Sequence, residues 1–307
     1  AGLAALLGVM LFVPLPRPVL RTGQIIFALL FVWAAWNLWG YLRWDFFTSY
    51  ASRFPAQAGI RAPLWGSIWV CAICGLVALP TGVATAIYLE EFAPKNRLTN
   101  FIRLNISNLS GVPSIVYGII GLTAFARLFN IFGTARDKPG FEFGTPDNWF
   151  YIRLPFGSGV LAGGLTLMLV ILPIVIIASQ EAIRAVPNSL RQGALAMGST
   201  RWQMVWRMTL PASIPSIMTG AILAMSRAIG EAAPLLVLGV PLFLRRTPEN
   251  LMSEFTVLPL QIYRWAADPR VDFRDLAAAG IVVLLVVLLT FNALAIFIRT
   301  KLQKPLS

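Results

Sequence analysis

Residues 277–298 read AAAGIVVLLVVLLTFNALAIFI, an apolar run without a charged side chain. A bilayer core about 30 Å thick needs roughly 20 apolar helical residues to cross it, so this run predicts a membrane-spanning helix. Similar runs lie at residues 24–42, 64–89, 111–131, 158–179 and 213–240. Because unpaired backbone groups are costly in lipid, and because the runs lack the alternation of barrel strands, we expect helices. The sequence therefore predicts an all-α membrane protein with about six transmembrane helices.

The overall composition agrees with this class. Of the 307 residues, 57% are hydrophobic and 12% are charged, and the mean hydropathy is +0.73, which is too apolar for a soluble domain of this length. The formal net charge of +12 would suggest nucleic acid in a soluble protein. Here nearly all the basic residues lie between the spans, where they can meet lipid head groups. We expect the lipid bilayer as a partner and no nucleic acid.

The residue inventory argues against catalysis by this chain. The sequence has no histidine, which removes the commonest general base and metal ligand, and no G-x-x-x-x-G-K-[ST] phosphate loop. Cys71 and Cys74 lie inside an apolar run, where packing is a better interpretation of C-x-x-C than redox chemistry. We expect no catalytic residue, no metal and no cofactor, so uphill transport would use an ion gradient or a separate ATPase chain.

The polar segment at residues 181–211 reads EAIRAVPNSLRQGALAMGSTRWQMVWRMTLP. Leu190, Ala194 and Met197 follow one another at i, i+4 and i+7, which predicts a short helix with one apolar face that ends at Gly198. Periodicity alone favours a helix lying on the membrane surface, because tryptophan and arginine are typical of that interface.

The order of residues in this segment, however, resembles the cytoplasmic loop of ABC importer permeases. That loop has the pattern E-A-A, three residues, G, nine residues, I, one residue, L-P. The matching positions are Gln192, Gly193 and Ala194, then Gly198, Met208, Leu210 and Pro211. The resemblance implies the type I ABC importer permease architecture, with residues 180–211 forming a cytoplasmic knob that docks a separate ATPase. The residues it assigns to this coupling are Arg191, Gln192, Gly193, Ala194, Gly198, Arg201 and Trp202.

Further motifs resemble the phosphate branch of these permeases. SGVPSIVYGIIG at residues 110–121 is similar to a signature of phosphate importer permeases, while AIYLEEFAP at 86–94 and MSRAIGEAAPLLVLG at 225–239 resemble the PstA-type subunit more than its PstC-type partner. The resemblance covers roughly residues 64–300. It implies a permease subunit of an ATP-driven phosphate importer in the bacterial inner membrane. The implied partners are a PstC-type permease, a PstB-type ATP-binding subunit and an extracytoplasmic PstS-type phosphate-binding protein.

The resemblance leaves other functions and the topology to be tested. A permease for another oxyanion, such as sulfate or molybdate, fits the same residues, and a gradient-driven secondary transporter or a non-transporting scaffold are the alternatives from other classes. If the loop at 180–211 is cytoplasmic, residues 136–153 should be extracytoplasmic and the tail at 301–307 cytoplasmic.

Two charged residues inside the fifth apolar run are the candidates for substrate contact. Arg227 lies about half-way along residues 213–240, so at ~1.5 Å per residue it falls near mid-membrane, where a charge costs about 3 kcal/mol and normally has a partner. Glu231 is that partner by its i+4 spacing, and Pro234 predicts a kink beside the pair. The pair is either structural or part of the substrate path, since a guanidinium matches an oxyanion bidentately. Arg127 is better explained as a head-group anchor.

The remaining expectations concern domain boundaries and glycines. Residues 1–63 should form an N-terminal membrane segment with the first span, and residues 1–13 fit the end of a truncated span slightly better than a re-entrant piece or a processed leader. Residues 64–300 should form the permease domain. Tight helix packing is expected at Gly111, Gly118, Gly121 and the G-x-x-x-G pair Gly159 and Gly163.

Overall fold

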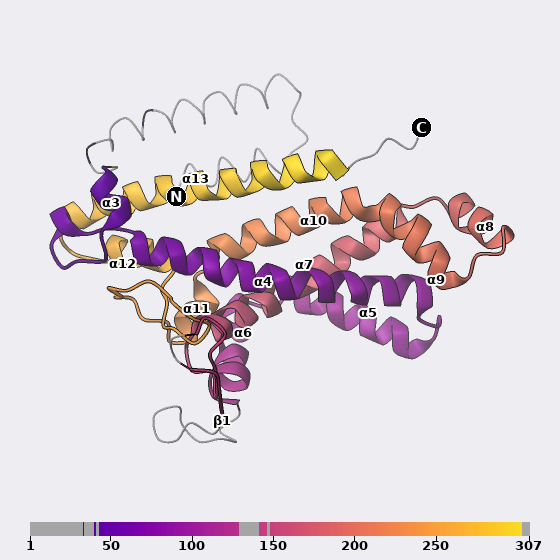
Figure 1. Ribbon diagram of the computed structural model, residues 1–307, viewed down its shortest axis with the longest axis horizontal. Helices are drawn as coiled ribbons and strands as arrows, with labels where there is room; N and C mark the ends of the chain where they lie inside the picture. The colour runs from indigo at the N-terminus through magenta and orange to yellow at the C-terminus, as the bar shows by residue number, and fades with distance from the viewer. Residues whose placement is uncertain (1–32, 34–39, 41–42, 129–140, 146–147, 303–307) are drawn as a thin grey trace.

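The computed structural model describes residues 33, 40, 43–128, 141–145 and 148–302. Within these ranges most residues are helical (Figure 1). The predictions for residues 1–13 and for most of the first span, at 24–42, lie outside the described residues, as does nearly all of the tail at 301–307.

Four helices in the described part of the chain are long and apolar enough to cross a membrane: Arg61–Phe92, Val160–Arg184, Arg201–Gly230 and Val271–Lys301. They contain α4 (Arg61–Ile87), α7 (Val160–Arg184), α10 (Leu210–Gly230) and α13 (Val271–Leu302). These helices run lengthwise through the molecule in Figure 1. The spans predicted at 64–89, 158–179 and 277–298 are confirmed in type and approximate position.

Within the span predicted at 111–131, the described residues are helical only over Ser114–Ala126, and this shorter helix is bent sharply away from the helix before it. The chain forms α5 (Arg97–Ser110) and α6 (Ser114–Gly121) with a π-helical turn at Leu122–Ala126, and the two parts are bent by 103°. The break lies at Pro113, whose ring restricts the preceding residue to extended backbone and removes a helical donor. Hydropathy alone does not reveal this broken pair, because α5 is a polar helix and the predicted apolar run begins only after it.

The short elements outside the spans gather at the end of the bundle opposite α8 (Figure 1). They are α3 (Trp44–Thr48), η1 (Pro55–Gln57), α11 (Ala233–Val237), α12 (Leu258–Ala266) and the antiparallel strands β1 (Phe141–Phe143) and β2 (Ile152–Leu154). In this two-stranded sheet Phe141 lies opposite Leu154. The all-α prediction therefore holds for the spans and misses a small hairpin between two of them.

Small residues bring the spanning helices together. A Cβ added to Gly82 of α4 would lie 2.6 Å from Val175 of α7, and one added to Gly164 of α7 would lie 2.6 Å from Ile73 of α4. Backbones that approach this closely are typical of helix packing in lipid. Cys74 is fully buried in the same core, as expected for a packing role.

The glycines predicted at packing positions behave in three ways. Gly118 packs against the backbone of Pro234, 2.7 Å from an added Cβ, whereas Gly111 has only a loose neighbour at 3.5 Å. The face of Gly159 and Gly163 is tightly packed, but against the non-helical segment around Met252 and not against another helix. Backbone hydrogen bonds from Val160 and Leu161 to that segment, at 3.0 and 2.9 Å, hold the contact. The prediction of close approach is thus right for Gly118 and wrong for Gly111.

Two polar contacts join α10 to α13. The Ser226 hydroxyl donates to Oδ1 of Asn292 at 2.6 Å, and Nη1 of Arg299 donates to the Thr219 hydroxyl at 3.1 Å. The donors and acceptors are seven residues apart on each helix, so the contacts recur after two turns. Hydrogen bonds of this kind act between helices in lipid, and here they fix the register of the antiparallel pair.

Candidate functional site

Residues 188–209 form a helix–turn–helix that projects at one end of the bundle (Figure 1). It consists of α8 (Asn188–Ala196), a turn at Gly198 with φ of +86°, α9 (Arg201–Met204) and a π-helical turn at Val205–Thr209 that leads into α10. Gly198 suits this turn because a side chain is crowded in the left-handed region. The predicted short helix that stops at a glycine is confirmed.

Local capping and a small apolar cluster hold this segment in shape. The Thr200 hydroxyl accepts from the backbone N–H of Gln203, and the Gln203 side-chain oxygen accepts from the backbone N–H of Thr200, forming a capping box. Ala194 and Met204 are buried together against Phe92 at the end of α4. Met197 lies beyond the end of α8 and is 87% exposed. The predicted apolar face therefore includes Ala194 but not Met197, because the helix ends before that residue.

The outer surface of the segment carries most of the residues assigned to coupling. Trp202 is 58% exposed and stacks on Trp206 with ring centroids 5.5 Å apart. The other coupling residues with exposed positions are Gln192, Gly193, Gly198 and Arg201. A rigid, exposed surface with an aromatic pair is suited to docking a protein partner.

Arg191 does not belong to that outer surface. Its side chain is only 17% exposed, and Nε donates to the carboxylate of Glu91 at 3.0 Å. Its terminal nitrogens donate to the carbonyls of Val186 at 2.8 Å and Ile183 at 2.6 Å. The donors of Arg191 are directed into the protein, so any part it has in coupling would be played from inside the segment and not by direct contact with a partner.

The Arg227–Glu231 pair lies where the fifth span breaks. Helix α10 ends at Gly230, Glu231 is extended with φ of −85° and ψ of 117°, and α11 starts at Ala233 with Pro234 in its first turn. The predicted span at 213–240 is therefore interrupted, not merely kinked. Nε of Arg227 and Oε2 of Glu231 are 3.9 Å apart, and the side chains are 47% and 19% exposed. The distance between the two charged groups is long for an ion pair, and about half of the Arg227 side chain stays exposed.

The depth of Arg227 follows from the neighbouring helices. Met225, on the same turn, packs its methyl group against Gly75, with 3.2 Å to an added Cβ, and Gly75 lies near the middle of the Arg61–Phe92 helix. Arg227 also lies within electrostatic range of Tyr117 in α6. Arg227 is thus placed near mid-span by the contact that Met225, on the same turn of α10, makes with α4, and not by the length of its own helix.

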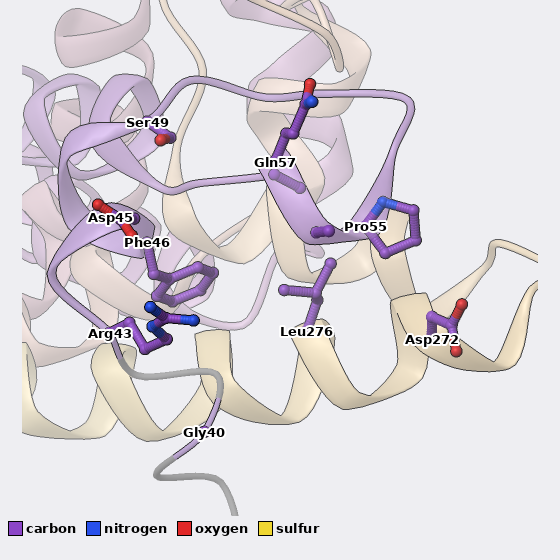
Figure 2. Close-up of a pocket in the computed structure, with 11 residues that line it drawn as sticks. Gly40, Arg43, Asp45, Phe46, Ser49, Pro55, Gln57, Asp272 and Leu276 are labelled. Atoms are coloured by element: carbon purple, nitrogen blue, oxygen red, sulfur yellow. The ribbon is translucent and has the colours of Figure 1, made fainter.

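The cavities near these elements differ in chemistry. A cavity of about 370 Å³ beside Met225 is lined almost entirely by apolar groups of α4, α10 and α13, which do not suit an oxyanion. A second cavity of about 350 Å³ lies at the end of the bundle away from α8, where α3 and η1 meet the start of α13. Figure 2 shows Arg43 and Asp45 on one side of it and Asp272 on the other. Neither cavity contains Arg227.

Sequence reasoning missed an acidic site at the end of α4. Glu90 and Glu91 lie in a π-helical turn, Tyr88–Phe92, and their side chains are only 10% and 8% exposed. The signal was visible as two consecutive carboxylates that close an apolar span. Among the described residues, no group of three or more histidine, cysteine, aspartate or glutamate side chains is placed to hold a metal ion.

Apolar spanning helices, a projecting helix–turn–helix and a charged pair near mid-span together define a membrane permease. The chain belongs to the family of binding-protein-dependent transport system inner membrane components, whose pattern matches residues 78–306. The predicted class, the inner-membrane location and the non-enzymatic role of the subunit agree with this family.

Individual relatives and solved structures support the assignment. The chain is 34% identical over 281 residues to the probable ABC transporter permease protein YqgI of Bacillus subtilis (strain 168), covering 87% of this chain and 86% of the relative. It is 30% identical over 246 residues to the phosphate transport system permease protein PstA of Yersinia pestis, covering 80% and 74%. A bacterial alginate ABC transporter in complex with its pentasaccharide-bound periplasmic protein shares the fold, with a TM-score of 0.60, 16% identity and coverage of 94% and 92%.

Proposed function

We propose that this chain is the membrane-spanning permease subunit of an ATP-driven importer of inorganic phosphate, which forms the translocation path and couples it to a separate ATPase. The observation that carries the proposal is the position of Arg227. Its guanidinium is 47% exposed beside a helix break, near mid-span, where an arginine is expected only if it faces an aqueous path or a protein interior. The relation to a phosphate transport system permease supports phosphate as the oxyanion.

The geometry of the pair suits transient binding of an anion. A planar guanidinium can donate two parallel hydrogen bonds to an oxyanion. Glu231, 3.9 Å away, is close enough to attract the guanidinium after the anion leaves and too far to occupy its donors in a short hydrogen bond. Exchange between these two partners would bind phosphate without retaining it.

Coupling would start at the helix–turn–helix of residues 188–209. Its exposed residues, including Gly198, Arg201 and Trp202, form the surface proposed to dock a PstB-type ATP-binding subunit. From this surface the helix Arg201–Gly230 runs past Arg227, which lies about 39 Å along it from Arg201 at 1.5 Å per residue. The other proposed partners are a PstC-type permease, which completes the path, and an extracytoplasmic PstS-type binding protein.

The proposal assigns the α8 end to the cytoplasm. The C-terminal end of α13 lies at the same end, and the β1–β2 hairpin lies at the other (Figure 1). Single cysteines replacing Arg153 and Lys301, in a chain without Cys71 and Cys74, can be probed with an impermeant thiol reagent in intact cells. Labelling is expected at position 153 only, and labelling at 301 only would reverse the topology.

Phosphate uptake by the assembled complex tests the role of Arg227. Arg227→Lys keeps the charge but loses the bidentate fork, so phosphate uptake per assembled complex should fall at least tenfold while assembly persists. Arg246→Lys is the matched control, because Arg246 pairs with Glu254 at 2.7 Å on an exposed surface, with side chains 66% and 54% exposed. This control should leave uptake unchanged.

A purely structural ion pair gives a different result. Replacing Arg227 and Glu231 together by leucine would then restore both assembly and uptake, since apolar packing can replace a buried pair. Near-normal phosphate uptake in that double variant would refute the substrate role. Uptake of sulfate or molybdate in place of phosphate would refute the choice of anion.

A further inference from the structure

Five charged side chains meet where α4, α5, α7 and α8 converge. The Glu90 carboxylate accepts from Nη1 of Arg103 in α5 at 2.8 Å, and from Nη2 and Nε of Arg184, the last residue of α7, at 2.8 and 3.0 Å. Arg103 also donates to the backbone carbonyl of Leu89. Charge-assisted and bidentate contacts of this kind are the strongest hydrogen bonds in proteins. Glu90 therefore ties the end of α4 to two other helices.

Glu91 makes a separate connection from the same turn. Successive residues of a helix diverge by about 100°, so Glu91 points away from the partners of Glu90 and meets Arg191 of α8 at 3.0 Å. The same guanidinium donates to the carbonyls of Ile183 and Val186. One arginine thus links α8 to both the end of α4 and the end of α7.

The local backbone and the access of solvent indicate that this cluster of ion pairs can rearrange when the helices move. The two carboxylates lie in a π-helical turn, a distortion that is frequent at functional positions in helices. All five charged residues line an open cavity of about 640 Å³ that also contains Lys95. Water in this space can solvate the ion pairs when the helices shift.

We propose that Glu90 and Glu91, with Arg103, Arg184 and Arg191, form a carboxylate clamp that transmits movement of the docking segment to the spans. The inference rests on the proposed function, in which α8 is part of the ATPase docking segment. A displacement of α8 acts on α4 through Arg191 and Glu91, and Glu90 carries α5 and α7 with it. Because Gly75 in the middle of α4 packs against Met225, two residues before Arg227, α4 provides a second route from the ATPase to the proposed substrate site. The five are positioning residues and contact no substrate.

The coupling ratio of the reconstituted complex tests the clamp. Phosphate uptake and ATP hydrolysis are measured in proteoliposomes that contain the whole importer, and uptake per ATP hydrolysed is compared with the amount of ATP-binding subunit retained per permease. Glu91→Gln should keep the shape of the side chain but weaken its hold on Arg191. We expect the ratio to fall at least tenfold, with ATP hydrolysis continuing when the binding protein is omitted. Glu254→Gln, in the exposed pair with Arg246, is the control and should leave the ratio unchanged.

If the Glu91→Gln complex does not assemble, Arg191→Lys provides a second test of the clamp. Lysine preserves the positive charge beside Glu91, but it lacks the fork that reaches Glu91 and the two carbonyls together. The same tenfold fall is expected. A ratio within twofold of the control in every complex that assembles, even when less complex forms, would overturn the clamp and leave a merely structural role.

Failure of the proposed function would look different. A wild-type complex that hydrolyses ATP and takes up sulfate or molybdate instead of phosphate would contradict the assigned substrate only. The ratio measured with that oxyanion would then decide on the clamp by the same twofold and tenfold criteria. A permease that retains no ATP-binding subunit in its wild-type form would overturn both proposals.

Discussion

The contact between α7 and α10 provides a quantitative test of the helix packing. A Cβ added to Gly220 of α10 would lie less than 3.0 Å from the Cβ of Ala178 in α7. Carbon atoms in contact normally stay about 3.5–4.0 Å apart, so Gly220→Ala requires the two helices to separate by at least about 0.5 Å. Because both atoms are bound directly to backbone, neither can move aside by a change of rotamer.

The expected cost follows from overpacking. Adding a carbon to a well-packed core costs about 1–3 kcal/mol, against a gain of up to about 1 kcal/mol from the better helix propensity of alanine. Gly230→Ala measures that gain separately, because Gly230 is in the same helix and has no neighbouring atom within 4 Å of an added Cβ. Relative to this control, Gly220→Ala should lower the unfolding midpoint by about 2–12 °C, using about 2–4 °C per kcal/mol for a large domain.

The reciprocal exchange completes the test. Ala178→Gly alone should destabilise by about 1 kcal/mol through lost propensity and packing. The double variant Gly220→Ala with Ala178→Gly moves one methyl group across the interface. Its free energy of unfolding should therefore return to within about 1 kcal/mol of the wild-type value. The assay is thermal unfolding of the purified complex in one detergent. A Gly220→Ala midpoint equal to that of the control, or a double variant as unstable as the sum of the singles, would refute the close approach of α7 and α10.

Three further predictions concern other parts of the chain. Gly198→Val places a β-branched residue at φ of +86°, a strain of about 1–3 kcal/mol, so less ATP-binding subunit should co-purify, and an unchanged yield would contradict the docking assignment. Ser226→Ala removes the 2.6 Å hydrogen bond to Asn292 and should destabilise the protein by about 0.6 kcal/mol and at most about 1.7 kcal/mol. A double-mutant cycle with Asn292→Leu should give a coupling energy of the same size, and a coupling energy of zero would show that the bond does not stabilise the helix pair. Replacing Cys71 and Cys74, both free thiols, by alanine should leave phosphate uptake intact, whereas loss of uptake at normal assembly would point to a chemical role.

The sequence alone determined the features that depend on short stretches of chain. Transfer of an apolar run into lipid is a property summed over its own residues, so the spans at 64–89, 158–179 and 277–298 could be located from composition. The stop at Gly198 depends on local backbone freedom, and the spacing around it was sufficient to predict the projecting helix. The approach of Arg227 to Glu231 was likewise accessible from their i, i+4 spacing, although Glu231 lies just beyond the end of α10 and the two charged groups stay 3.9 Å apart.

Only the tertiary structure decided which residues that are distant in sequence meet one another. Arg191 belonged to a basic, exposed segment by its sequence neighbours, yet Glu91, one hundred positions earlier, turns its side chain inward. Glu90 gained its role because three helices converge on one carboxylate, and Gly159 packs on Met252 from another part of the chain. Hydropathy and periodicity cannot predict which distant residues come into contact. The energy of an ion pair or a close contact depends on the distance between the two partners and not on the identity of either alone.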